Sequence, residues 1–333
     1  MNSARILIAY IFFIFTIVPA NAQATHAEKL GFPKGAKVLI LHVDDGGMSF
    51  DSNQGVIQAM EKGVANSVSV MMPCPWVPGF VHYLKQHPKI DAGLHLTLTS
   101  EWDDYRWPPL SGKKGTPGLV DSEGAMWASV EDVVKYSNAD EVEMEIRSQL
   151  ERARTMGFEP THLDSHMGTL FATTEFLQRY IKVGIESKIP VMFPGGHNTM
   201  IGKQRQVTAE LQKQFAQVGQ TIWDAGLPVL DDLHNVSYDW NYPDKKTSDA
   251  DLQKFSTSQY IQTIKELKPG LTMVIMHCSA PTEVFQYITD SGIIRKADLL
   301  AMQDPAFKKF LQSESIILTT WREVMERRGK VKP

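Results

Sequence analysis

The chain has 333 residues, of which 43% are hydrophobic and 22% charged, and its formal net charge is −4. This length is enough for one large α/β domain or two small ones. Basic runs and basic-aromatic interleaving are absent from the sequence, so nucleic acid is not an expected partner. Two cysteines, Cys74 and Cys278, are too few for a disulfide scaffold, and the sequence leaves open whether they pair.

The first 22 residues have the pattern of a secretory signal peptide. A single positive charge, Arg5, precedes an apolar core over residues 6–18, and Ala20-Asn21-Ala22 supplies the small residues of a cleavage site. The alternative, an uncleaved membrane anchor, needs an apolar run of about 20 residues, and this core is shorter. We therefore expect an exported, periplasmic or extracellular protein without a stable membrane span after cleavage.

Short apolar, β-branched runs then alternate with longer amphipathic runs. This alternation predicts an α/β fold with parallel strands, a distorted TIM-like (β/α) barrel, in a single domain. We divide the chain into a signal peptide (1–22), an N-terminal extension (23–36), the barrel (37–325) and a basic C-terminal tail (326–333). Strands are expected at 37–43, 67–72, 91–97, 161–164, 191–193, 271–276 and 315–318, and helices at 54–62, 80–86, 140–156, 174–187, 206–225, 257–267 and 296–311.

Two stretches, 101–129 and 234–249, lack clean periodicity. Long insertions of this kind in a compact domain are usually functional. The aromatic residues of the first stretch could form a wall on which a sugar ring stacks, or they could simply close one end of the barrel. They are Trp102, Tyr105, Trp107 and Trp127.

Adjacent carboxylates, Asp44 and Asp45, come directly after the first strongly apolar run of the mature region. Burying two carboxylates is costly unless a cation or proton chemistry uses them. The C-terminal ends of parallel strands are also where α/β folds collect their sites. A solvated Asp-Asp-Gly-Gly turn would explain the pair by itself, so residues further along the chain must decide between the two interpretations.

Three more predicted strand ends carry histidine or aspartate. His95 lies inside an apolar strand, His277 follows another, and His162, Asp164 and His166 alternate, which in an extended segment places all three on one face. Two imidazoles and one carboxylate suit a divalent cation that keeps open positions for water and substrate. Each group alone could be structural, but their shared place at strand ends favours one site. The other histidines considered show no such pattern; these are His42, His82, His87, His197 and His234.

Five pieces of sequence match one known family in order and spacing. They are residues 39–47 (LILHVDDGG), Asn53 with Gly55, residues 93–99 (GLHLTLT), residues 160–166 (PTHLDSH) and residues 274–277 (VIMH). In these motifs the chain resembles the YdjC-like carbohydrate deacetylases, which include chitooligosaccharide deacetylases, and the resemblance runs from about residue 37 to about residue 321. It implies a distorted TIM-like barrel that removes N-acetyl groups from sugars with a divalent metal.

The resemblance also implies roles for individual residues. Asp45, His95 and His166 would hold the metal, while His162 and Asp164 would support these ligands by orienting them or fixing a tautomer. Zn²⁺ or Mg²⁺ is the expected ion, and Mn²⁺ or Ni²⁺ also suits the donor set. The sequence departs from part of the family at Gly47, where a bulky residue is common, and at Met167-Gly168, where many members have further histidines. These departures bear on substrate preference more than on metal binding.

By the same resemblance, Asp44 would be the general base that activates a metal-bound water, and His277 the acid that protonates the leaving amine. A divalent metal polarises an amide carbonyl and lowers the pKa of its water, while the amine leaves poorly without a proton. The expected reaction is removal of acetyl from an N-acetylated sugar or oligosaccharide. Hydrolysis of another amide or ester, and carbohydrate binding without catalysis, are the alternatives.

Overall fold

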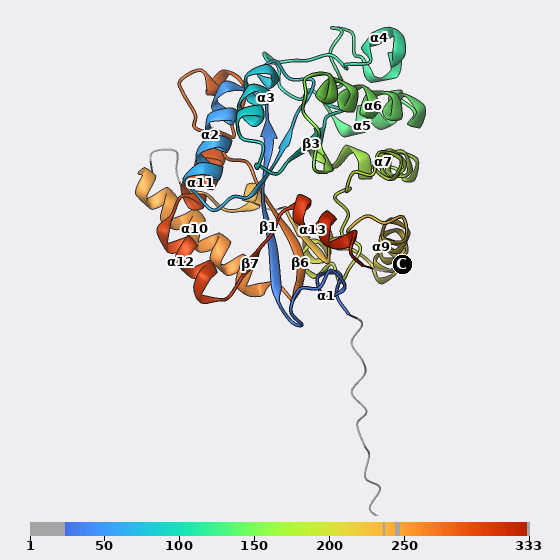
Figure 1. The fold of residues 1–333 in the computed structure, drawn as a ribbon. Coiled ribbons are helices and arrows are strands. Elements are labelled where there is room, and N and C mark those ends of the chain that lie inside the picture. The colour runs from blue at the N-terminus through green and yellow to red at the C-terminus, as the bar shows by residue number, and fades with distance from the viewer. Residues whose placement is uncertain (1–23, 236, 244–246, 332–333) are drawn as a thin grey trace, which may run out of the picture.

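A parallel sheet built around the most apolar strand forms the framework of the protein. The computed structural model describes residues 24–235, 237–243 and 247–331 (Figure 1), and the predicted signal peptide lies outside them. The strand order is β4-β3-β2-β1-β6-β5, with β7 paired to β1. The strands are β1 (Lys37–Gly46), β2 (Ser67–Val70), β3 (Ala92–Leu96), β4 (Leu163–Ser165), β5 (Asp232–His234), β6 (Gly270–Met276) and β7 (Ile317–Leu318).

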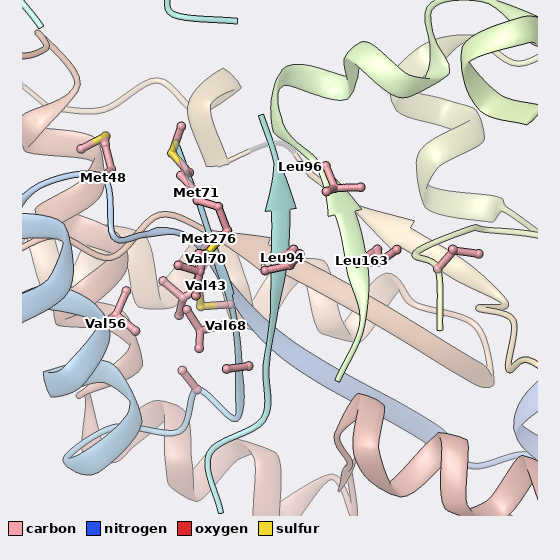
Figure 2. Packing of buried hydrophobic residues seen from close by; sticks show 14 of the residues in the cluster. Val43, Met48, Val56, Val68, Val70, Met71, Leu94, Leu96, Leu163 and Met276 are labelled. Carbon is pink, nitrogen blue, oxygen red and sulfur yellow. The ribbon is translucent and has the colours of Figure 1, made fainter. Parts of the chain in front are cut away.

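Strand β1 is buried on both faces, as its near-continuous apolar run requires in a parallel sheet. It pairs with β6 from Lys37 to Val43. On its other side it pairs with β7 at Val38 and Leu39, and with β2 from His42 onward. Apolar side chains from neighbouring strands, among them those of Val43, pack in one buried cluster against the surrounding helices (Figure 2).

Residues 190–196 join the two edges of the sheet. Val191 forms an isolated parallel bridge with Leu163 of β4, and Pro194 forms another with Leu230, just before β5. The sheet therefore curls back on itself, which confirms the predicted distorted barrel. The strand predicted at 191–193 is wrong as a regular strand, because the prolines at both ends of this segment have no N–H to donate to a ladder.

Helices flank the curled sheet (Figure 1). The helices predicted at 54–62, 80–86, 140–156, 174–187, 206–225 and 257–267 correspond to α2, α3, α6, α7, α9 and α10, and α1, α4, α5, α8 and α13 were not predicted. The bounds are α1 (His26–Lys29), α2 (Phe50–Glu61), α3 (Val77–Gln86), α4 (Gly112–Gly115), α5 (Val130–Tyr136), α6 (Ala139–Thr155), α7 (Thr174–Ser187), α8 (Thr199–Arg205), α9 (Ala209–Asp224), α10 (Asp249–Glu266), α11 (Gly292–Met302), α12 (Pro305–Ser313) and α13 (Trp321–Arg328). Among the helices of the described residues, none combines the length and apolar character needed to cross a membrane.

One predicted helix is divided in the structure. The segment 296–311 is split between α11 and α12 at Asp304-Pro305. Asp304 caps α12 by accepting from the main-chain N–H of Ala306, and Pro305 occupies the first helical position, where its missing N–H costs nothing. The chain thus stops one helix and starts another within a single amphipathic pattern.

The face of β1 that points into the barrel changes from apolar to polar along the strand. Val38 and Ile40 lie in a buried apolar cluster with residues of β6, α1 and α13. His42 and Asp44 come next at the same spacing of two, so they share that face. Figure 1 places α1 beside the N-terminal end of β1, where it covers the barrel floor. The polar half of the interior therefore lies at the opposite, carboxyl end of the strands.

Candidate metal centre and active site

Both carboxylates at the end of β1 face the same histidine. Neighbouring residues of a regular strand point to opposite sides, but the ladder between β1 and β2 shifts register between Val43 and Gly46, and Asp45 has a φ of +66°. As a result Asp44 Oδ2 lies 3.8 Å, and Asp45 Oδ1 3.4 Å, from Nε2 of His95. The backbone irregularity is what allows two adjacent residues to serve one site.

Asp45, His95 and His166 converge from three strands, as predicted. They come from β1, from β3 and from the residue that follows β4, and they are 1%, 2% and 5% exposed. Asp45 Oδ1 lies 3.4 Å from His95 Nε2 and 3.6 Å from His166 Nδ1. All three donor atoms lie within 4.8 Å of one another, as a shared ion requires.

The chemistry of these donors fits a divalent cation. Asp45 Oδ1 is buried, yet within residues 24–235, 237–243 and 247–331 it has no hydrogen-bond partner. Leaving a buried carboxylate oxygen unpaired is costly, and a cation between this oxygen and the two imidazole nitrogens would remove that cost. Two nitrogens and one oxygen also leave positions open for water and substrate.

The other oxygen of Asp45 is held by an arginine that was not predicted from the sequence. Arg295, on α11, is 4% exposed, and its Nη1 lies 2.6 Å from Asp45 Oδ2. Its Nε donates to Ser291 Oγ at 2.8 Å, which fixes the guanidinium. Burial alone would raise the pKa of Asp45, but Arg295 and the neighbouring histidines hold it well below its usual value. Asp45 is therefore an ionised carboxylate whose Oδ1 is available to a cation.

Each predicted histidine ligand is oriented by a carboxylate on its far nitrogen. His95 Nδ1 lies 2.7 Å from Asp164 Oδ1, and His166 Nε2 lies 2.9 Å from Glu101 Oε1. This leaves Nε2 of His95 and Nδ1 of His166 directed at Asp45, an arrangement that fixes tautomer and ring orientation. Burial lowers the pKa of His166, but Glu101 and Asp45 overcome this and raise it to about 10, so an incoming cation must displace a proton.

His277, predicted as the acid, lies across the site at the end of β6. Its Nε2 is 3.7 Å from Asp44 Oδ2, and its side chain is 13% exposed. Its ring packs edge-on against Tyr238 at 4.7 Å, and its main-chain N–H donates to Asp298 Oδ2 at 2.9 Å. Burial lowers the pKa of His277 to about 4, so the imidazole of the free protein is neutral near pH 7.

The two predicted supporting residues differ in position. Asp164 contacts the candidate ligand His95 directly. His162 lies deeper, with its Nε2 3.6 Å from Asp164 Oδ2 and its ring stacked on Trp321 at 5.2 Å. His42, which was not predicted to belong to the site, lies fully buried between Asp44 and Asp164. Its position two residues before Asp44 on one strand was the available signal, because that spacing places both side chains on one face.

The aromatic residues of the 101–129 insertion have separate surroundings. Trp107 is 1% exposed and its indole N–H donates to Thr99 O, so it belongs to the packed interior of the insertion. Trp102 and Tyr105 are half-buried and pack edge-on against it, at 5.5 Å and 5.9 Å. Trp127 stacks at 4.3 Å on Tyr136 of α5. Of the four residues considered for a sugar-stacking wall, Trp107 is buried, whereas Trp102, Tyr105 and Trp127 are half-buried.

The structure answers the question that the sequence left open about the cysteines. Cys74 and Cys278 are both buried free thiols in the described part of the chain. Burial raises the pKa of each thiol well above its usual value, so both remain protonated and behave as small apolar side chains.

Comparison with known proteins supports the family resemblance seen in the sequence motifs. Residues 38–313 match the family described as YdjC-like protein. The chain belongs to the YdjC-like family. A carbohydrate deacetylase of Thermus thermophilus is 29% identical over 302 residues, which cover 90% of this chain and 97% of the relative. A carbohydrate deacetylase of Thermoanaerobacter pseudethanolicus is 21% identical over 285 residues, covering 86% and 98%.

Two further comparisons extend this picture of a YdjC-like protein. A chitooligosaccharide deacetylase of Yersinia enterocolitica is 32% identical over 135 residues, which cover 39% of this chain and 49% of the relative. A crystal structure of a protein from Enterococcus faecalis has a TM-score of 0.68 at 19% identity, covering 87% of this chain and 99% of that one. At that identity the likeness concerns the fold alone, and it agrees with the distorted barrel.

Proposed function

We propose that this YdjC-like protein is a metal-dependent deacetylase that removes the acetyl group from an N-acetylated sugar or oligosaccharide. The observation that carries the proposal is Asp45 Oδ1, a buried oxygen without a hydrogen-bond partner in the described part of the chain, which lies between two oriented imidazoles with a second carboxylate, Asp44, beside it. The relatives named as carbohydrate deacetylases supply the class of substrate. A protein that only binds sugar would have no need for a second carboxylate next to Asp45.

Asp45, His95 and His166 would hold the ion, and their donor set favours Zn²⁺ or Mg²⁺, with Mn²⁺ or Ni²⁺ also compatible. When bound, such a cation polarises an amide carbonyl and makes a nearby water easier to deprotonate. Arg295 restricts Asp45 to one free oxygen, and the carboxylates of Asp164 and Glu101 keep the two imidazoles aimed at it.

The remaining two residues move protons. Asp44 Oδ2 lies on the site side of its carboxylate, where it can take a proton from the attacking water. His277 Nε2, 3.7 Å away, can pass a proton to the leaving nitrogen, which departs poorly as an unprotonated amine. Because the two groups are this close, the proton that Asp44 takes up can be the one that His277 delivers.

Acetate release tests the proposal directly. The protein, with and without a chelator, is incubated with a panel of N-acetylated mono- and oligosaccharides, O-acetylated sugars and unrelated amides. We expect acetate from at least one N-acetylated sugar, loss of release with chelator, and recovery when a divalent ion is returned. Release only from O-acetyl esters or from other amides would favour the broader hydrolase, and sugar binding without release from metal-loaded protein would favour a binding role.

The role of His277 has its own test, because a leaving group that needs no proton should not need the acid. In His277→Gln, we expect deacetylation of an N-acetyl sugar to fall by about 100-fold or more. Hydrolysis of an acetyl ester with a phenolate leaving group should change much less. An equal fall for both substrates would contradict the acid assignment.

We also propose that the protein is exported. The support is the signal pattern of residues 1–22, which lie outside the described structure. Secreted or periplasmic protein should begin at Gln23 by mass spectrometry of its N-terminal peptide. Full-length protein retained in the membrane fraction would indicate the uncleaved anchor.

A further inference from the structure

We propose that His42 is a positioning residue that ties Asp44 to Asp164, and so aligns the proton-accepting carboxylate with the carboxylate that orients His95. The consequence for turnover rests on the proposed function, in which Asp44 accepts the proton. The link between the side chains rests on contacts alone. His42 is neither a ligand of the predicted ion nor placed to touch substrate, because it is fully buried beneath both carboxylates.

The fold places His42 where the barrel interior turns polar. It is two residues after Ile40, which belongs to the apolar floor cluster, and two before Asp44. The next strand holds its ring: His42 pairs in register with Ser67 of β2, whose Oγ lies 2.9 Å from Nδ1, and Ser69 Oγ lies 3.0 Å from Nε2. Both ring nitrogens therefore have partners, and the ring cannot rotate without losing them.

Each carboxylate contacts His42 through one oxygen and a histidine of the candidate site through the other. The Nε2 of His42 is 3.1 Å from Asp44 Oδ1 and 3.0 Å from Asp164 Oδ2. Of the opposite oxygens, Asp44 Oδ2 lies 3.7 Å from Nε2 of His277, and Asp164 Oδ1 lies 2.7 Å from Nδ1 of His95, the nitrogen that points away from Asp45. Nε2 of His42 is hydrogen-bonded to Ser69 Oγ, and Asp164 Oδ2 has no hydrogen-bond partner among the described residues, so these are ion-pair contacts, with one imidazole lying between both carboxylates.

Charge supports the same arrangement. Two carboxylates buried this close together repel each other unless a cation separates them. Burial lowers the pKa of His42, but its contacts with Asp164 and Asp44 overcome this and raise it to about 9. A different use of the same atoms is a second ion, since donor atoms of His42, His162 and Asp164 also lie within 4.8 Å of one another. Metal content therefore has to be measured together with the kinetics.

Kinetics of matched variants test the effect on turnover. His42→Leu removes the link, whereas His42→Gln returns an N–H donor at a similar reach. We expect His42→Leu to lower kcat about 100-fold, with KM within about threefold and unchanged metal content, and His42→Gln to recover at least about tenfold of the loss. The control is His26→Leu, another buried histidine, on the barrel floor, which should leave kcat unchanged.

Two kinetic results and one metal analysis would overturn the proposal. The first is a kcat of His42→Leu within about threefold of the parent. The second is a glutamine variant no better than the leucine variant. The third is two ions per parent chain with one of them lost in His42→Leu, which would make His42 a ligand of a second ion.

A measurement on the resting protein separates this link from the deacetylase activity. In protein labelled with ¹⁵N-histidine, the imidazole N–H resonances of His42 are identified by their loss in His42→Gln. They should shift in Asp44→Asn and in Asp164→Asn, but not in Asp231→Asn, a buried carboxylate that contacts the floor. These shifts without any acetate release would contradict the proposed function alone, and their absence would contradict the link itself.

Discussion

Carboxylates are buried at both ends of this barrel, and their partners differ completely. On the floor, Asp231 accepts the main-chain N–H of His26 at 2.7 Å through Oδ1, and those of Ala27 and Leu271 at 2.9 Å and 2.8 Å through Oδ2. At the rim, Asp45 has an arginine on one oxygen and no hydrogen-bond partner on the other among the residues described. Burial is the same, at 2% and 1% exposed.

The comparison shows which buried carboxylates maintain the fold. Asp91 resembles Asp231, because it accepts the main-chain N–H groups of Trp321 and Arg322 at the start of α13. Both satisfy donors that a helix N-terminus leaves free, and their negative charge suits that end of a helix. A carboxylate with its acceptor sites filled by main-chain donors is structural, whereas one left unpaired beside two imidazoles is poised for a ligand.

The largest expected effect is loss of the ion from the rim. His166→Ala or His95→Ala removes one of three protein ligands, so the purified variants should contain little bound metal and release no acetate. Elemental analysis of parent and variants prepared side by side measures this. Unchanged metal content in either variant would reject the ligand set, and Asp231→Asn, matched in burial, should keep its metal.

The next largest effect is a contrast between Asp44, the proposed base, and Asp231, a structural carboxylate. Asp44→Asn should lower kcat by about 10³-fold while metal content stays largely intact, because only the proton acceptor is lost. Asp231→Asn should keep kcat but lower the free energy of unfolding by about 1–3 kcal/mol, because a buried main-chain donor loses its acceptor. Acetate release and urea unfolding of both variants measure the two quantities. Full activity in Asp44→Asn would contradict its role as base.

A smaller effect is expected from the residue that orients His166. Glu101→Gln keeps the size of the side chain but weakens the interaction with His166 Nε2, so affinity for the ion should fall by about 10–100-fold. Competition with a metal indicator measures this affinity. The control is Glu123→Gln in the same insertion, an exposed partner of Arg106, and an equal loss in both variants would show that Glu101 has no special role.

The convergence of the three candidate ligands was predictable because strand order and motif order agree. Asp45, His95 and His166 each follow or end an apolar run, and parallel strands bring such ends to one rim. Sequence could not show that a register shift turns Asp45 to the same side as Asp44. That irregularity depends on the pairing of β1 with β2.

Other site residues could not be predicted for physical reasons. Arg295 reaches Asp45 from α11, 250 positions along the chain, and Glu101 reaches His166 from the irregular insertion. Neither approach can be read from periodicity, because both depend on how a helix or loop packs over the rim. His42 is different, because its spacing from Asp44 places it on the inward face. It was left out of the predicted site because it resembles an ordinary core histidine.

A pH dependence of stability is also expected from the floor. Burial lowers the pKa of His26 to about 4, whereas the same imidazole in the unfolded chain titrates near 6.5. Between these pH values the unfolded chain binds a proton that the folded chain does not, so this contribution is complete above pH 6.5 and is lost as the pH falls toward 4. It amounts to about 3 kcal/mol at most.

Urea unfolding of the parent and of His26→Gln, measured from about pH 7.5 to about pH 4.5, isolates this contribution. The difference in free energy of unfolding between the two proteins should change in favour of the variant as the pH falls, because glutamine takes up no proton. A difference that stays constant with pH would show that His26 does not titrate between folded and unfolded chains. The backbone N–H of residue 26 still reaches Asp231 in the variant, so such a result would leave the structural role of that carboxylate intact. It would assign the acid sensitivity to other groups, and buried His234, whose pKa burial also lowers to about 4, is the first to test.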